Sequence, residues 1–199
     1  MKLQVDAILL AAGESKRMGP ANKLFLEVNG KPMIEHTIDA LSQSSIRALI
    51  IVTSPVNLQS FSPNVLQNHR VVLNPDYQKG MTTSIQKGVE ASSPGAAGYM
   101  ICMSDQPFMQ AAEYDLLITH FQEAYSQNPA SIVVPFYQNR KGNPVIFSTQ
   151  YRTAILEHQE MEGCKAIVQK NKPHLVRVDM PSDAIVRDID TPEDYDKLS

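Results

Sequence analysis

The chain has 199 residues, 43% of them hydrophobic and 20% charged, and a formal net charge of -3 at pH 7, which fits one compact domain over residues 1–199. The acidic balance argues against a nucleic-acid-binding protein, because phosphate backbones need a basic surface. No stretch approaches the apolar length of a membrane span, and the start of the chain lacks the long apolar region of a signal peptide.

Strand-like and helix-like segments alternate along the chain. Short apolar runs predict buried strands, and apolar residues at helical spacing predict helices. The expected strands, in chain order, are 7–10, 48–53, 70–73, 99–103, 131–135, 144–147, 175–178 and 184–187. The expected helices are 31–41, 82–91, 111–126, 149–158 and a last one opened by Thr191-Pro192. Pro135 is expected to end its strand or to place it near an edge of the sheet.

The repeated order of strand and helix predicts an α/β fold: a single-domain, Rossmann-like three-layer sandwich with a mostly parallel sheet. Ligands of such sheets bind outside the carboxyl ends of the strands, near the point where the strand order reverses. Two loops follow strands at such ends, namely Ala11–Asn22 and Ser104–Pro107. We therefore expect the functional site to form between these loops.

The first loop carries two glycines and two well-spaced cations. Gly13 and Gly19 let backbone N–H groups approach phosphate oxygens, and Arg17 and Lys23 can neutralise a triphosphate. The loop is not a Walker A motif, because Pro20 follows Gly19, and its glycine spacing is not that of the dinucleotide fingerprint. The residues alone are equally compatible with an ordinary turn that carries solvated charges.

Carboxylates stand at two further places that suit a metal ion. Asp105 follows a buried strand, and Asp190 precedes the last predicted helix. Mg²⁺ prefers one or two carboxylates together with substrate phosphates and water. The alternative is that Asp105 caps a turn and that Asp190 caps the last helix. Glu193 and Asp194 lie in the first turn of that helix, where the helix dipole favours negative charge.

Two segments in the middle of the chain are rich in polar and turn-forming residues. Asn74–Ser84 leads into a helix N-terminus, which is a natural place to hold an anion or a base edge. Arg140–Pro144 places two cations and a glycine before a strand. Each segment also fits a plain surface turn.

Cysteine and histidine usage limits the chemistry further. Cys102 and Cys164 are the only cysteines, which excludes a disulfide framework and a cysteine-built zinc site and fits a cytoplasmic location. The 5 histidines lack metal-ligand spacing. No Ser-His or Cys-His pairing for nucleophilic catalysis is evident.

These motifs together resemble one family. Leu10-Ala-Ala-Gly-Glu-Ser-Lys-Arg-Met-Gly19 with Lys23 is similar to the signature loop of the MobA/MocA-like nucleotidyltransferases of molybdenum cofactor biosynthesis. The other matching segments follow in the family's order: 30–36, 74–76 with Gly80, Met81 and Ser84, 105–107, 142–144 and 188–195. Within the family, Ala-Ala-Gly and Asp-Gln-Pro resemble the molybdenum cofactor cytidylyltransferases. The chain departs at Asn143, where that group commonly has histidine.

The resemblance implies a fold like that of nucleotide-diphospho-sugar transferases and a defined reaction. The terminal phosphate of molybdopterin attacks the α-phosphorus of CTP, pyrophosphate leaves, and Mg²⁺ assists. A transient contact with a molybdoenzyme or its chaperone is also implied. The implied catalytic residues are Arg17, Lys23 and Asp105, and the metal ligands are Asp105 and Asp190. The implied nucleotide-binding residues are Leu10, Ala11, Ala12, Gly13, Arg17, Lys23, Asn74, Ser84 and Asp105, and the acceptor residues are Gly142, Asn143 and Pro144.

Three other functions remain open at this stage: a guanylyltransferase of the same cofactor, a nucleotidyltransferase for another phosphorylated acceptor, and a non-catalytic carrier of the cofactor. A carrier would be expected to lose a cation or a metal ligand of the set. The chain retains Arg17, Lys23, Asp105 and Asp190, which favours an enzyme. We expect CTP over GTP, because a methyl group at Ala12 would narrow the base pocket.

Overall fold

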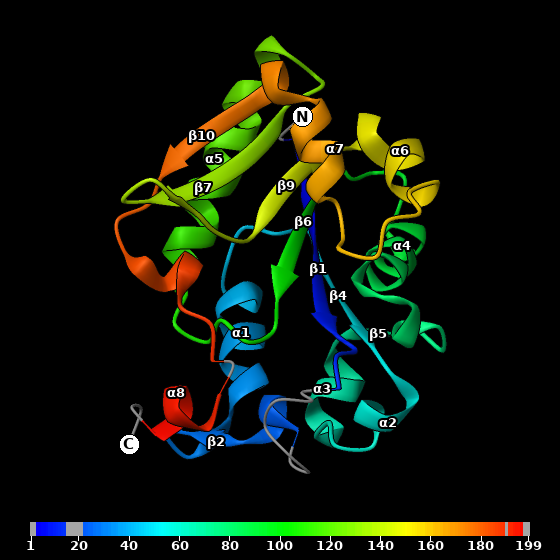
Figure 1. The fold of residues 1–199 in the computed structure, drawn as a ribbon, viewed down its shortest axis with the longest axis vertical. Helices are drawn as coiled ribbons and strands as arrows, with labels where there is room; N and C mark the ends of the chain where they lie inside the picture. Colours follow the sequence, from blue (N-terminus) through cyan, green and yellow to red (C-terminus); the bar gives the residue numbers. More distant parts are fainter. Residues whose placement is uncertain (1–2, 15–21, 190, 197–199) are drawn as a thin grey trace.

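The computed structural model describes residues 3–14, 22–189 and 191–196. Within these ranges an eight-stranded sheet forms the centre of the molecule (Figure 1). Its strands are β1 (Val5–Ala11), β4 (Ala48–Thr53), β5 (Arg70–Leu73), β6 (Gly98–Met103), β7 (Ile132–Tyr137), β8 (Arg140–Lys141), β9 (Val145–Ser148) and β10 (Leu175–Asp179). A separate two-stranded sheet pairs β2 (Glu27–Val28) with β3 (Lys31–Pro32).

Helices connect most of the strands. The α-helices are α1 (Met33–Ser42), α2 (Pro55–Leu58), α3 (Pro63–Asn68), α4 (Met81–Ala91), α5 (Ala111–Gln127), α6 (Arg152–Leu156), α7 (Lys165–Lys170) and α8 (Pro192–Asp196). Short 3-10 helices cover Lys23–Phe25, Tyr77–Lys79, Thr149–Tyr151, Lys172–His174 and Asp183–Val186. The helix expected over 149–158 therefore forms as a 3-10 turn followed by the five-residue α6.

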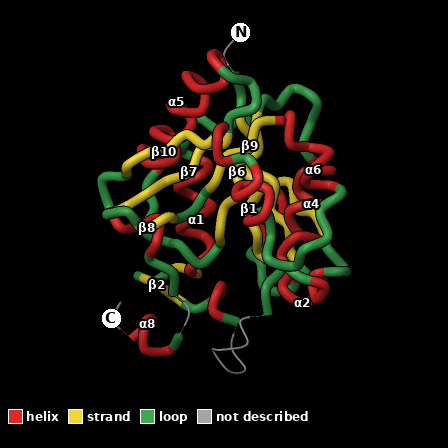
Figure 2. The backbone as a smooth tube through the Cα atoms, turned by 45° about the horizontal axis from the view of Figure 1, so that its top comes forward, coloured by secondary structure: helices red, strands yellow, loops and turns green. Residues whose placement is uncertain are grey.

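Two hydrophobic cores lie on opposite faces of the sheet. Side chains alternate across a strand, so Ala7 and Leu9 of β1 join the core under α1 and α5. Ile8 and Leu10 join the other core, with α4, α6 and α7. Figure 2 shows the strands running through the middle of the molecule with helices on both sides. The expected three-layer α/β fold is confirmed.

The order of the sheet is β10-β7-β9-β6-β1-β4-β5, with β8 paired to β7. Strand β1 pairs in parallel with β4 on one side and with β6 on the other, while β9 runs antiparallel to both of its neighbours. The sheet is thus mostly parallel, as expected. Because β4 and β5 extend to one side of β1 and β6 lies on the other, the strand order reverses between β1 and β6.

Strand β7 continues through Pro135 to Tyr137, so this proline does not end the strand. The strand lies next to the edge strand β10, and Val178 of β10 is the partner of Pro135. Strand β9 pairs with β7 only at Ile132 and Val133, before the proline is reached. The alternative expectation, a position near the edge of the sheet, is confirmed.

The strand expected over 184–187 is wrong, because Asp183–Val186 forms a 3-10 helix. The hydroxyl of Ser182 accepts a hydrogen bond from the backbone N–H of Ala184 and caps this turn. Ile185 is fully buried, and its carbonyl accepts bonds from the backbone N–H of Asn143 and the side chain of Gln106. A short apolar run can thus be buried in a turn when its polar groups find partners outside a sheet.

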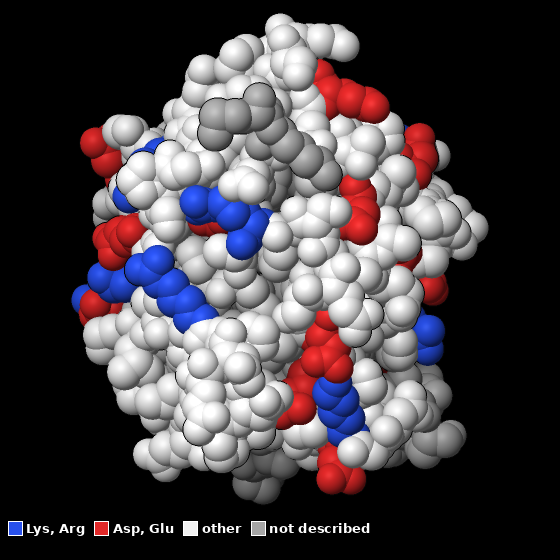
Figure 3. Space-filling model, turned by 180° about the vertical axis from the view of Figure 1, so that it is seen from behind, with Lys and Arg blue, Asp and Glu red and all other residues white. Residues whose placement is uncertain are grey.

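None of the described helices combines the length and the apolar character that a membrane crossing needs. On the face seen in Figure 3, Lys and Arg side chains form small groups near Asp and Glu. The described part of that face therefore presents no continuous basic surface to a polyanion.

Helix α4 lies so close to the sheet that Gly88 has no room for a side chain. A Cβ there would lie 2.2 Å from Cγ2 of Ile8, which is fully buried on β1. We expect Gly88→Ala to destabilise the protein, because overpacking of about 1–3 kcal/mol exceeds the helix-propensity gain of up to ~1 kcal/mol. Thermal or urea unfolding measures the change.

The matched control is Glu90→Ala on the exposed side of the same helix. It should change the free energy of unfolding by less than about 0.5 kcal/mol. A Gly88→Ala protein as stable as the wild type would contradict the close contact between α4 and β1.

Candidate functional site

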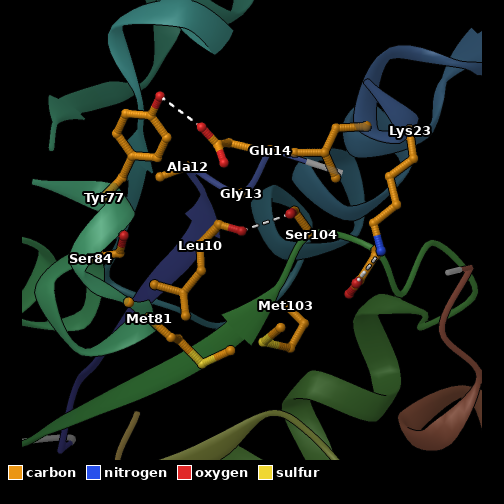
Figure 4. Close-up of a pocket in the computed structure, with 13 residues that line it drawn as sticks. Leu10, Ala12, Gly13, Glu14, Lys23, Tyr77, Met81, Ser84, Met103 and Ser104 are labelled. Carbon is orange, nitrogen blue, oxygen red and sulfur yellow. Dashed lines mark hydrogen bonds and ion pairs between the residues drawn. The ribbon is translucent and has the colours of Figure 1, made fainter. Parts of the chain in front are cut away.

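The larger of two neighbouring pockets opens at the carboxyl ends of β1 and β6, where the strand order reverses. It has a volume of about 460 Å³. Its lining residues are Leu10, Ala12, Gly13, Glu14, Lys23, Leu24, Tyr77, Gly80, Met81, Ser84, Met103, Ser104 and Asp105 (Figure 4). The two loops expected to form the site therefore meet at one cavity.

An ion pair in this pocket joins Lys23 to Asp105. The ammonium nitrogen lies 2.7 Å from Oδ2 of Asp105, and the two side chains are only 11% and 15% exposed. Lys23 begins a 3-10 turn that Asn22 caps by accepting the N–H of Leu24 at 3.1 Å. Because solvent is largely excluded, this ion pair is screened less than a surface pair.

The other oxygen of Asp105 fits a cation. Oδ1 is buried and has no hydrogen-bond partner among the described residues. A buried carboxylate oxygen without a partner is costly, and a cation would relieve that cost. No group of three His, Cys, Asp or Glu side chains in the described ranges forms a metal site. A metal on Asp105 would thus draw further ligands from elsewhere, as Mg²⁺ does with substrate phosphates.

Two predicted residues, Arg17 and Asp190, lie outside the described residues. The residue before Asp190 is described: Ile189 donates its backbone N–H to the carbonyl of Asp105 at 3.1 Å. Gln106, which is 2% exposed, donates to Asp188 Oδ1 at 2.6 Å. The chain leading to Asp190 is thereby held against the turn that carries Asp105.

The predicted nucleotide-binding residues divide into two groups. Leu10, Ala12, Gly13 and Ser84 line the larger pocket. A Cβ built on Gly13 would meet no atom within 4 Å, so the backbone there is open to a ligand.

Ala11 and Asn74 are fully buried and are not among the lining residues. Ala11 packs in the opposite core with Leu9. Asn74 donates its amide to the hydroxyls of Thr83 and Ser84, both at 2.9 Å, and so orients Ser84. Asn74 thus acts on the pocket through Ser84, whereas Ala11 belongs to the core on the other face of the sheet.

The predicted acceptor residues lie beside a smaller pocket of about 120 Å³, which Asn143 lines. Gly142 is buried, and a Cβ there would lie 2.3 Å from the carbonyl oxygen of Ile185. Pro144 is also buried and is not among the lining residues. Asn143 alone of the three presents a side chain to a pocket.

Sequence reasoning missed Asn57, which is 4% exposed on α2. Its amide nitrogen donates to the carbonyls of Ala11 at 2.9 Å and Gly13 at 3.0 Å. Its Oδ1 accepts a bond of 2.8 Å from the amide of Asn22. Asn57 thus holds the start and the end of the loop together. Its distance along the chain from these partners left no local signal.

Tyr77 and Ser104 were missed as well. The hydroxyl of Tyr77 donates to Glu14 Oε1 at 3.2 Å across the rim of the larger pocket (Figure 4). Ser104 donates to the carbonyl of Leu10 at 2.6 Å. Their neighbours Asn74 and Asp105 had drawn attention to both segments, but not to these side chains.

Neither cysteine is placed to act as a nucleophile. Burial raises the pKa of both thiols, that of Cys164 to about 12. A thiol with such a pKa stays protonated near neutral pH and is a poor nucleophile. The described site therefore offers charge and positioning, with no activated thiolate.

Two curated relatives match nearly the whole chain, and a third matches about half of it. Nicotine blue oxidoreductase of Paenarthrobacter nicotinovorans is 25% identical over 98% of this chain and 96% of its own. Purine catabolism protein PucB of Bacillus subtilis strain 168 is 27% identical over 96% and 94%. Molybdenum cofactor guanylyltransferase of Vibrio atlanticus is 33% identical over 106 residues, 52% of this chain and 50% of its own.

Solved structures share the fold. A nucleotidyl transferase of Methanothermobacter thermautotroptrophicus superposes with a TM-score of 0.80 at 19% identity, over 98% of this chain and 95% of its own. Rv0371C of Mycobacterium tuberculosis H37Rv, solved in complex with manganese, superposes with a TM-score of 0.74 at 22% identity, over 100% and 98%. At these identities the likeness concerns the fold alone.

A protein-family model matches most of the chain. The model of the MobA-like NTP transferase domain matches residues 7–176. The matched range includes β6, Asp105 and Asn143. The match spans both loops of the larger pocket and most of the sheet. The chain therefore belongs to the family of the MobA-like NTP transferase domain.

Proposed function

We propose that the protein transfers CMP from CTP to the terminal phosphate of molybdopterin, with Mg²⁺ and with release of pyrophosphate. The observation that carries the proposal is the Lys23–Asp105 pair, which leaves a buried carboxylate oxygen without a partner beside the larger pocket. The pair lies at the reversal of strand order, where α/β sheets bind nucleotides. The family membership supports the same reaction class.

The residues of the chain position and neutralise the reactants. The loop around Ala12 and Gly13, with Arg17, holds the β- and γ-phosphates. Lys23 stabilises negative charge that develops at the α-phosphate. The acceptor phosphate is already ionised near neutral pH, so its oxygen attacks the α-phosphorus without a general base. The bond from the α-phosphorus to pyrophosphate breaks, and pyrophosphate takes the electron pair.

Asp105 and Asp190 are the proposed ligands of the metal ion. When bound, Mg²⁺ would neutralise the nucleotide phosphates and hold the acceptor beside them. The bond from Ile189 to the Asp105 carbonyl supports the shared site, because Ile189 is the neighbour of Asp190 in the chain. The manganese complex of the Rv0371C structure supports a divalent cation on this fold.

Base choice is the least constrained part of the proposal. Ala12 lines the larger pocket with Leu10 and Ser84. We propose that the base lies beside Ala12, where its methyl group would reduce the space for a purine. The second candidate is GTP, because relatives that share parts of the chain are named molybdenum cofactor guanylyltransferase. Redox chemistry, named for the Paenarthrobacter relative, is less favoured because the loop lacks the dinucleotide fingerprint.

The first prediction about the reaction concerns the nucleotide. Pyrophosphate release is measured with CTP, GTP, ATP and UTP, each with and without molybdopterin. We expect release that requires molybdopterin and prefers CTP by about tenfold or more in kcat/KM, since one misfit group is worth ~1–3 kcal/mol. Ala12→Gly should relax the preference and admit GTP. Equal use of GTP by the wild type would overturn the cytidylyl proposal and leave the nucleotidyl transfer standing.

The second prediction concerns the metal. Asp105→Asn removes a charged ligand but keeps the size of the side chain, so turnover should fall about a hundredfold or more. Nucleotide affinity, measured by equilibrium titration, should change much less. Asp179→Asn, an exposed carboxylate paired with Arg177, is the matched control. An Asp105→Asn enzyme with normal turnover and normal Mg²⁺ dependence would exclude Asp105 as a ligand.

The third prediction tests the anchor of the loop. Asn57→Asp replaces the donating amide by an oxygen that repels the carbonyls of Ala11 and Gly13. Losing two bonds of about 1 kcal/mol each should raise the nucleotide KM tenfold or more, while kcat stays close to the wild-type value. Asn64→Asp, exposed on α3, should leave both constants unchanged. A normal KM in a folded Asn57→Asp protein would show that the loop does not need this anchor.

A further inference from the structure

The smaller pocket adjoins the larger one, and of its lining residues only Asn143 was among the predicted acceptor residues. Met81 and Met103 line both pockets, so the two share a wall. The remaining lining residues of the smaller pocket are Ile85, Ile101, Lys141, Val145, Phe147, Glu162, Cys164, Lys165 and Val168. They come from α4, β6, β8, β9 and the segment around α7.

The sheet fixes where this pocket lies relative to the reacting centre. Ile101 and Met103 are two residues apart on β6 and face the same side, and Asp105 follows two residues later. Ile101 is paired with Val145 in the antiparallel ladder, so the chain around Asn143 runs past the end of β6. The smaller pocket therefore lies along β6 from Asp105, within the same continuous surface as the larger pocket.

The rim of the smaller pocket carries excess positive charge. Lys141 and Lys165 both line it, and Glu162 lies 3.5 Å from Lys165. The ammonium group of Lys141 forms no hydrogen bond or ion pair with the described residues, while its backbone pairs with Phe136 of β7. Burial, and then the charge of Lys165, lower the pKa of Lys141. Two ammonium groups beside one cavity repel each other, and an anionic or electron-rich ligand would relieve that repulsion.

The floor of the smaller pocket is apolar. Ile85, Val145 and Phe147 are buried there, and the Cys164 thiol remains neutral because burial raises its pKa to about 12. An apolar floor with a cationic rim suits a ring whose faces are apolar and whose edge carries carbonyl or anionic groups. The volume of about 120 Å³ admits only one end of an acceptor.

We propose that the smaller pocket binds the ring end of the acceptor, away from its reacting phosphate, with Lys141 and Lys165 as specificity-determining residues. The inference rests on the proposed function for the identity of the acceptor, a molybdopterin with a heteroaromatic ring. It adds two residues outside the nucleotide loop that select the acceptor and do not touch the nucleotide.

The test compares Lys141→Gln and Lys165→Gln with Lys170→Gln, which removes an exposed charge from the same helix as Lys165. Pyrophosphate release is followed while molybdopterin and nucleotide are varied separately. We expect each pocket variant to raise the molybdopterin KM about tenfold, with the nucleotide KM and kcat within about twofold of the wild type. Lys170→Gln should leave all three constants unchanged.

A second readout does not depend on turnover. The fluorescent anionic ring 6-carboxypterin is titrated against each protein in the presence of nucleotide. Binding to the wild type and Lys170→Gln, with weaker binding to the two pocket variants, supports the inference even where no transfer occurs. Transfer with an unchanged molybdopterin KM in both pocket variants overturns the inference alone. Absence of transfer overturns the proposed function, and absence of lysine-dependent binding then overturns the inference as well.

Discussion

The parallel pairing of β1 with β6 is the constraint on which the site depends. Leu10 of β1 is the partner of Met103 of β6, so the residues that follow both strands leave the sheet at the same edge. Ser104 extends this link by donating its hydroxyl to the carbonyl of Leu10. The backbone ladder thus brings Gly13 and Asp105 to one pocket before any charged side chain contributes.

The loop that leaves β1 must also return to the sheet with Lys23 correctly placed. Asn57 meets this need by binding Ala11 and Gly13 on the outgoing side and Asn22 on the returning side. The Asn57 side chain that makes these contacts is 4% exposed, so water competes little for its amide. A site ordered in this way before the ligand arrives loses less entropy on binding.

Sequence patterns predicted the parts of the structure that depend on local residue types. The apolar runs of β1, β4 and β6 leave few alternatives to buried strands, and a carboxylate directly after such a strand pointed to Asp105. Contacts between distant segments left no such pattern. The bonds that Asn57 makes to the loop join residues 35 to 46 positions apart.

The wrong prediction of a strand at 184–187 shows a different limit of sequence patterns. Its apolar residues indicate burial but not the backbone conformation that achieves it, because a run of this length fits a strand or a buried turn equally well. The capping by Ser182 and the bonds to the Ile185 carbonyl decided the outcome. Gln106 and Asn143 reach the Ile185 carbonyl only in the folded chain, so the sequence around 184–187 does not reveal these hydrogen bonds.

Lys23 and Asp105 neutralise each other in the structure, and the proposed reaction gives each of them a different partner. Lys23 turns to phosphate, and both oxygens of Asp105 become available to a cation. A nucleotide that arrived without a cation would place its phosphates near an unneutralised carboxylate in a site that is poorly screened. The nucleotide and the cation are therefore expected to enter together, because only their joint arrival replaces the broken ion pair with two compensated contacts.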